Sequence, residues 1–183
     1  MSDLVVSKAG DAPASVKVWD PFVRLFHWSL VALVAAAFLT GDEAEKAHIA
    51  IGYAIVGLVA ARVVWGFVGP EHARFSDFVK SPAAILRYLS QALQGRAPRH
   101  LGHNPLGGAM MIALIAMLAV VCGGGYLLTT DAFWGAEEFK EVHEATAYLL
   151  LAMVGLHVLG AVWTGVQHRE NLVRAMITGR KAA

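Results

Sequence analysis

The chain has 183 residues, of which 57% are apolar and 16% are charged, and its mean hydropathy is +0.54. These values exclude an ordinary soluble domain and are typical of membrane proteins. The net charge of +1 at pH 7 says little about partners, among which we expect no nucleic acid. The single cysteine, Cys122, excludes a disulfide framework and a CxxC metal motif.

Four stretches are long and apolar enough to cross a hydrocarbon core, which needs about 20 residues of helix. They are residues 22–40, 47–68, 105–129 and 142–166. The N-terminus is polar up to Trp19 and lacks an apolar core followed by a small-residue cleavage site, so we expect the first span to be retained. The sequence therefore predicts an all-α membrane protein. A single four-helix transmembrane bundle over residues 19–168 lies between an N-terminal segment, 1–18, and a C-terminal tail, 169–183.

The basic residues are distributed unevenly between the two sides of the predicted bundle. One side carries only Lys46 and Lys140, in short loops that also hold acidic residues: Asp42, Glu43, Glu45, Asp131, Glu137 and Glu138. The other side carries Lys8, Lys17, Arg24, Arg74, Lys80, Arg87, Arg96, Arg99, Arg169, Arg174, Arg180 and Lys181. The positive-inside rule then predicts a multi-pass membrane protein with both termini and the loop 69–104 in the cytoplasm.

The long inner loop contains a short amphipathic pattern, SPAAILRYLSQALQGR. Its apolar residues recur at helical spacing, which predicts a helix at the inner membrane surface, in contact with lipid or packed on the bundle. In the following GHNPLGG, Asn104 is expected at the N-cap of the third span and Pro105 at its first helical position.

Four of the eight histidines fall within spans or at their ends: His27, His48, His143 and His157. Ionisable groups at such depths are costly and indicate function. Fourteen residues of helix place His143 and His157 roughly 21 Å apart and within about 40° of one face. By depth, His48 matches His143 near the outer surface, and His27 matches His157 nearer the cytoplasm. The remaining histidines, in or beside the cytoplasmic segments, need no special explanation: His72, His100, His103 and His168.

Arg62 follows His48 by the same fourteen residues and so lies on the same face at the inner level. A buried arginine needs an anion, and no carboxylate in the spans is placed to provide one. Two facing histidines with an arginine at one level suit a haem, whose iron takes two axial imidazoles and whose propionates accept the guanidinium. Without a CxxCH motif, the haems would be non-covalent and of b type.

Five glycines in the spans have two interpretations. They would let a porphyrin approach the backbone, or they would serve close helix packing. These residues are Gly52, Gly57, Gly123, Gly124 and Gly125.

Other uses of intramembrane histidines are less consistent with this pattern. A zinc site needs three or four ligands around one ion, whereas these histidines are separated by much of the depth of the membrane. A proton or cation transporter would be expected to carry Asp or Glu inside its spans, where Glu144 at an outer helix end is the nearest candidate.

The sequence resembles the bacterial cytochrome b561 group, which includes the cytochrome b subunits of nickel-iron hydrogenases. The landmarks are VWDPFVRLFHW, HIAIGY, RVVWGFVG, GHNPLGG and HEATAYLLLAMVGLH. The resemblance implies a four-helix bundle with two b haems, one held by His27 and His157 and the other by His48 and His143. It further implies contacts of Arg24 and Arg62 with the inner propionates, and places His103 and Asn104 where a propionate or quinone contact is expected.

From these features we expect a dihaem membrane cytochrome that carries electrons between an outer-surface redox partner and the quinone pool. The partner would be a periplasmic c-type cytochrome or a hydrogenase-like oxidoreductase subunit. The alternatives are a self-contained superoxide:quinone oxidoreductase and, less in keeping with the pattern, a histidine-bearing transporter or a membrane anchor.

Overall fold

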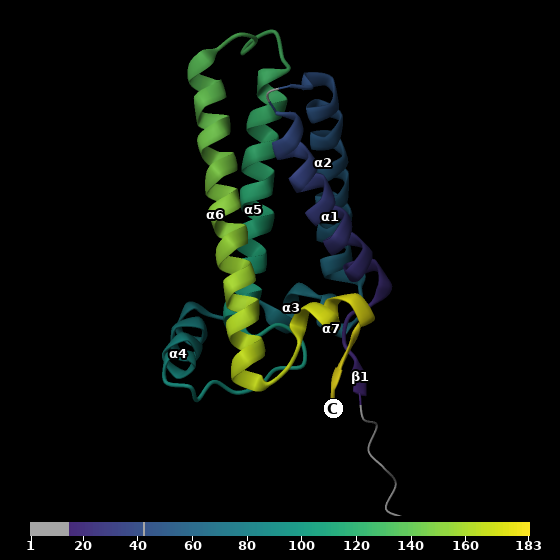
Figure 1. The fold of residues 1–183 in the computed structure, drawn as a ribbon, viewed down its shortest axis with the longest axis vertical. Helices are drawn as coiled ribbons and strands as arrows, with labels where there is room; N and C mark the ends of the chain where they lie inside the picture. Colours follow the sequence, from purple (N-terminus) through teal and green to yellow (C-terminus); the bar gives the residue numbers. More distant parts are fainter. Residues whose placement is uncertain (1–14, 42) are drawn as a thin grey trace, which may run out of the picture.

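The computed structural model describes residues 15–41 and 43–183. Four long helices lie side by side and form a bundle: α1 (Pro21–Thr40), α2 (Glu45–Val68), α5 (Pro105–Leu128) and α6 (Glu137–His168) (Figure 1). Each is long and apolar enough to cross a membrane. The prediction of a helical membrane bundle with four spans is therefore confirmed, although α6 extends beyond the predicted 142–166 at both ends.

Local sequence explains where two of these helices begin. The side chain of Asp20 caps α1 by accepting from the amides of Phe22 and Val23, and Pro21 occupies the first turn. Asn104 caps α5 as predicted, accepting from the amide of Gly107 at 2.7 Å.

The bundle buries little of its own surface. Of the residues in the most apolar part of each span, at most 17% are buried inside the protein, so most apolar side chains face outward as in helices surrounded by lipid. Helix α1 packs on α2, α2 on α5, and α5 on α6. An apolar layer centred on Ile55, Leu118 and Leu150 fills the middle of the bundle.

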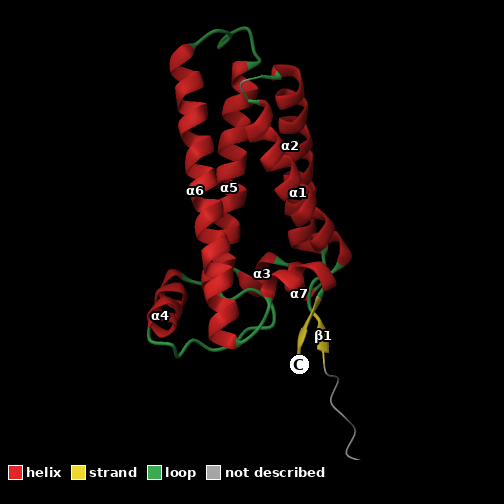
Figure 2. Cartoon of the chain, viewed as in Figure 1, coloured by secondary structure: helices red, strands yellow, loops and turns green. Residues whose placement is uncertain are grey.

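Short elements gather at one end of the bundle, which we call the inner end (Figures 1 and 2). They are the 3-10 turn η1 (Glu71–Ala73), α3 (Phe75–Phe78), α4 (Pro82–Leu93), α7 (Leu172–Thr178), β1 (Ser15–Lys17) and β2 (Arg180–Ala182). Helix α4 is the predicted amphipathic helix, begun by the Ser81 side chain accepting from the amide of Ala84. The opposite, outer end consists of the two short connections between the long helices.

The two terminal segments are joined to each other, which the sequence did not predict. Strands β1 and β2 pair antiparallel with Ser15 opposite Ala182, and the amide of Val18 donates to the carbonyl of Gly179 at 2.8 Å. Gly179 has φ of 80°, a conformation that glycine adopts without strain. Of the predicted N-terminal segment 1–18, residues 1–14 lie outside the described part of the chain, as does Asp42 in the outer loop.

Candidate functional site

Two pairs of histidines face each other across the bundle at two different levels. At the outer level, His48 of α2 and His143 of α6 have ring centroids 6.1 Å apart with an interplanar angle of 88°. At the inner level, His27 of α1 and His157 of α6 have ring centroids 6.4 Å apart at 51°. The apolar layer around Ile55 separates the two levels. The structure thus brings together the same pairs that depth along the helices predicted.

Backbone carbonyls determine which ring nitrogen is protonated in the outer pair. The Nδ1 atom of His48 lies 2.9 Å from the carbonyl oxygen of Ala37, and that of His143 lies 3.1 Å from the carbonyl oxygen of Val121. A carbonyl oxygen only accepts, so both Nδ1 atoms carry the hydrogen and donate it. Both Nε2 atoms keep a free lone pair, which is the arrangement found in histidines that bind metals.

The ring separations suit one metal ion between the two rings of a pair. A bond of about 2.0 Å from metal to imidazole nitrogen places the centroids of two such rings about 6 Å apart on opposite sides of the ion. An edge-to-face aromatic pair without a metal also has this spacing. The carbonyl contacts of His48 and His143 hold both rings with Nε2 free, an orientation that suits metal ligands.

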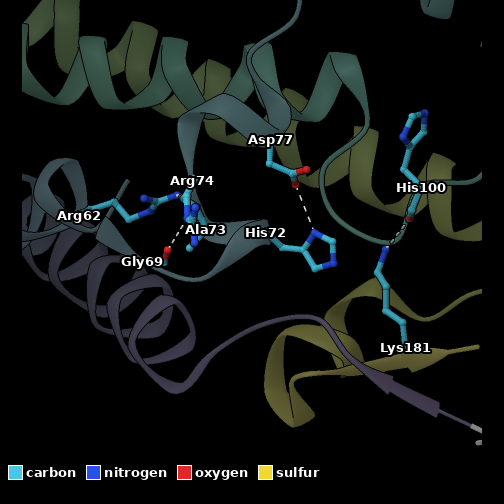
Figure 3. Close-up of polar contacts among 8 residues, drawn as sticks. All are labelled: Arg62, Gly69, His72, Ala73, Arg74, Asp77, His100 and Lys181. Atoms are coloured by element: carbon cyan, nitrogen blue, oxygen red, sulfur yellow. Dashed lines mark hydrogen bonds and ion pairs between the residues drawn. The ribbon is translucent and has the colours of Figure 1, made fainter. Parts of the chain in front are cut away.

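Arg62 is the most deeply buried charged residue in the described part of the chain, with 0% of its surface exposed. Its Nη2 donates to the carbonyl of Ala73 at 3.0 Å (Figure 3) and contacts the Met111 sulfur at 3.6 Å. Its Nε and Nη1 have no hydrogen-bond partner among the described residues. An uncompensated buried charge of this kind is costly, and an anion would offset the cost.

Arg62 belongs to a larger group of buried nitrogens at the inner half of the bundle that lack partners among the described residues. All seven such atoms are nitrogens, so what the region lacks is acceptor oxygens. A ligand with carboxylates fits this need, as the propionates of haem do. The atoms are Arg24 Nε, His27 Nδ1, Arg62 Nε and Nη1, Trp65 Nε1, His103 Nδ1 and His168 Nε2.

The other predicted site residues have structural partners of their own. Arg24 donates to the carbonyl of Ile177 through Nη2, which ties α1 to α7. Asn104 is occupied as the N-cap of α5. Neither contact tests the predicted role of these residues toward a propionate or a quinone.

His103 packs between two aromatic rings, with centroid distances of 4.7 Å to Trp19 and 4.9 Å to Phe78. Burial, together with the positive charges of Arg62 and Lys181, lowers the pKa of His103 to about 3. The ring is therefore neutral at pH 7, with one protonated and one bare nitrogen.

The glycines of α5 have a more specific role than the sequence predicted. A Cβ atom added at Gly125 would lie 3.0 Å from Cε1 of His143, and one at Gly124 would lie 3.7 Å from Nδ1 of the same ring. Gly125 therefore makes room for the His143 imidazole, whereas a methyl group at Gly124 would make only an ordinary contact with the ring. A Cβ added at Gly123, or at Gly52 and Gly57 of α2, would meet nothing within 4 Å, so open space lies beside those positions.

One contact between two polar residues at the inner end was not predicted from the sequence. The side chains of His72 and Asp77 are in contact there (Figure 3). The five-residue spacing of this pair crosses the break between η1 and α3, and no helical or strand period would have indicated it.

Comparison with known proteins gives the family to which the sequence is related. The sequence profile of the prokaryotic cytochrome b561 family matches residues 18–179. A protein of Bradyrhizobium diazoefficiens named as a probable Ni/Fe-hydrogenase B-type cytochrome subunit is 24% identical, with 91% of this chain and 86% of that protein covered. Proteins with the same name from Azotobacter vinelandii and Cupriavidus necator are 26% and 23% identical, covering 90% and 93% of this chain and 88% of each relative. No solved structure gives a significant match.

The family profile spans all four long helices and the four facing histidines. Proteins of this family bind haem b and take part in electron transport, which agrees with the imidazole pairs and with the unsatisfied nitrogens at the inner half of the bundle. The chain therefore belongs to the prokaryotic cytochrome b561 family and is a multi-pass membrane b-type cytochrome of electron transport.

Proposed function

We propose that the protein is a dihaem cytochrome that transfers electrons between a redox partner at the outer surface and the quinone pool, across the bacterial inner membrane with both termini in the cytoplasm. The two facing imidazole pairs, 6.1 Å and 6.4 Å apart between centroids, carry this proposal. His48 with His143 would hold the outer haem, and His27 with His157 the inner haem.

Each haem, when bound, would supply one-electron redox chemistry and would be held by the imidazole pair at its level. The protein positions the ligands. The carbonyls of Ala37 and Val121 hold the outer imidazoles with Nε2 free, and Gly125 gives His143 the space it needs. The apolar layer of Ile55, Leu118 and Leu150 keeps water from the region between the two levels.

Arg62 would hold the negative end of the inner haem. Its two unpartnered nitrogens offer two donors, and full burial makes a charged acceptor the favourable partner. Arg24, His103 and Asn104 lie at the same inner end, on α1 and at the start of α5, where they would complete the propionate or quinone contacts.

The charge of the outer end favours a positively charged redox partner. Lys46 and Lys140 are outnumbered there by acidic residues, so the surface potential is negative and repels an anion such as superoxide. A basic soluble carrier, such as a c-type cytochrome, suits this surface. The acidic residues that the structure describes at the outer end are Glu43, Glu45, Asp131, Glu137, Glu138, Glu141 and Glu144.

A hydrogenase-like subunit is the second candidate partner, because the relatives are named as hydrogenase cytochrome subunits. The alignment with the first of them spans 214 positions, more than the 183 residues of this chain, so that relative carries insertions. Where such insertions fall in the loops between spans, they would change the surface that meets a partner. The docking surface of this chain would then differ from that of the hydrogenase subunits even if the class of partner is the same.

The decisive experiment is purification of the full chain in detergent, with haem quantitation and a reduced-minus-oxidised spectrum. Two b haems per chain, reducible by a soluble quinol, are expected. His100→Ala serves as a control, because His100 is outside both pairs and the variant should keep both haems. A protein with no haem, or one that keeps both haems after loss of all four ligands, would contradict the proposal. Pull-down from membranes would then distinguish a co-purifying oxidoreductase subunit from a soluble carrier.

A further inference from the structure

A histidine and an aspartate lie in contact at the inner end, apart from both imidazole pairs. The Nδ1 atom of His72 lies 3.2 Å from Oδ2 of Asp77, with 23% and 29% of the two side chains exposed (Figure 3). His72 belongs to η1 and Asp77 to α3, the two short elements that follow α2. The pair is therefore within reach of water on one side while it packs against the bundle on the other.

The pair packs directly against the segment that leads into α5. A Cβ atom added at Gly102 would lie 3.0 Å from Nδ1 of His72 and 3.1 Å from Oδ2 of Asp77, so a larger residue would displace the pair. The next residue in the chain is His103, and its ring packs on Phe78, the neighbour of Asp77. The half-buried pair and the more deeply placed His103 are thus held together by two adjacent segments.

His103 faces the interior of the inner site. The charged and titratable groups around its ring come from four elements: Arg62 of α2, His157 of α6, Lys181 of β2 and His72 of η1. Its Nδ1 is buried and has no hydrogen-bond partner in the described part of the chain. A neutral imidazole in this position can take a proton on one nitrogen while it releases one from the other.

Burial and positive charge determine where a proton can rest along this route. Burial of His103, reinforced by the charges of Arg62 and Lys181, disfavours its charged form, so a proton does not stay there. At His72, the carboxylate of Asp77 offers a counter-charge to a protonated ring. The other ionisable groups near the pair are Glu71, exposed on η1, and His100 in the loop before α5.

We propose that the His72–Asp77 pair is the proton inlet of the inner site, which takes a proton from the aqueous phase and passes it through His103 to a quinone bound near the inner imidazole pair. This inference rests on the proposed quinone reaction. The reduction of a quinone takes two electrons, supplied through the cytochrome from the outer partner, and two protons, supplied from water through the pair. Both carbonyl oxygens become hydroxyls, and quinol oxidation reverses each transfer.

The test follows reoxidation of the dithionite-reduced full-length protein by a short-chain ubiquinone, mixed rapidly at pH 6, 7 and 8. The variants are His72→Gln and Asp77→Asn, which keep polar groups of similar size but do not carry the proton. Glu71→Gln is the matched control, since it removes a neighbouring exposed carboxylate outside the pair. Haem content and the reduced spectrum are recorded for each variant before mixing.

We expect His72→Gln and Asp77→Asn to keep both haems and the reduced spectrum. Their reoxidation by the quinone should be slower by about 10²-fold at pH 8, the lower end of the effect of losing a proton-transfer group. The loss should be smaller at pH 6, where water supplies protons more readily, and added imidazole should restore part of the rate in His72→Gln. Glu71→Gln should behave as wild type.

Wild-type rates in both variants at all three pH values would overturn the proton inlet while leaving the proposed function intact. Loss of haem in both variants would also overturn it, because the pair would then have a structural role. A wild-type protein that holds two haems but does not react with quinone would instead contradict the proposed function, and the inlet with it.

Discussion

Replacing Arg62 by methionine should change the stability of the protein in opposite directions with and without haem. The guanidinium is fully buried, and among the described residues its hydrogen-bond partners are the carbonyl of Ala73 at 3.0 Å and the sulfur of Met111 at 3.6 Å. In the haem-free protein no carboxylate among the described residues forms an ion pair with it. Methionine has a similar length and no charge, so the haem-free variant should unfold at the same temperature as wild type or at a higher one.

With haem present, the same substitution removes the partner of a buried anion. Breaking such a pair costs about 3–5 kcal/mol. Because about 1.4 kcal/mol corresponds to a factor of ten, the affinity for the inner haem should fall roughly 10²- to 10⁴-fold. The outer haem should be retained, since Arg62 lies fourteen residues beyond His48 along α2.

The assay combines haem quantitation during titration of haem into the purified protein with thermal unfolding of both forms, followed by tryptophan fluorescence. Arg87→Met is the control, because Arg87 is exposed on α4 and should affect neither quantity. Two haems bound with wild-type affinity in Arg62→Met would show that Arg62 does not hold an anion of the inner haem. A haem-free variant destabilised as much as the haem-bound one would show that the Ala73 contact, not the charge, is what matters.

Three further predictions concern single residues. His143→Ala should lose the outer haem and His157→Ala the inner one, each leaving one haem per chain, whereas loss of both haems from an intact fold would contradict the two-level assignment. Gly125→Ala places a methyl group 3.0 Å from Cε1 of His143, so the ring must shift; redox titration should detect an altered outer haem, and an unchanged potential would show that the ring has spare room. Because the pKa of His103 is lowered to about 3, the unfolded chain binds a proton below about pH 6.5 that the folded chain does not, and stability should fall by about 2 kcal/mol at pH 5. His103→Gln should remove this part of the acid sensitivity in thermal unfolding, and an identical pH profile in the variant would contradict it.

The helices and their levels could be predicted because both depend on properties local to one segment. Twenty apolar residues form a membrane span whatever their neighbours are, and Asn104 followed by Pro105 begins a helix through contacts within one turn. The depth of His143 and His157 follows from the rise per residue of a single helix. The pairing with His48 and His27 needed only the assumption that depth is matched across the bundle, and the ring separations agree with it.

The sequence did not predict the contacts between distant segments, because such contacts follow no periodic pattern of residues along the chain. The pairing of Ser15 with Ala182 joins the described ends of the chain, and the donation from Arg24 to Ile177 joins α1 to α7. Each contact depends on the direction that the chain takes after α6 ends at His168, and no local sequence pattern indicates that direction. The division of the sequence into an N-terminal segment and a C-terminal tail says nothing about contact between them, for the same reason.

The sequence by itself determined that the chain crosses a membrane four times and carries histidines at two depths, because hydrophobicity and helical rise are additive along one segment. Only the tertiary structure decided what those histidines and their neighbours can do. The protonation of the outer rings depends on carbonyls eleven and twenty-two residues away. The neutrality of His103 depends on burial and on groups from four different elements, and the contact of His72 with Asp77 joins η1 to α3. Such properties arise from distances in space, and helical periodicity constrains those distances only within a helix.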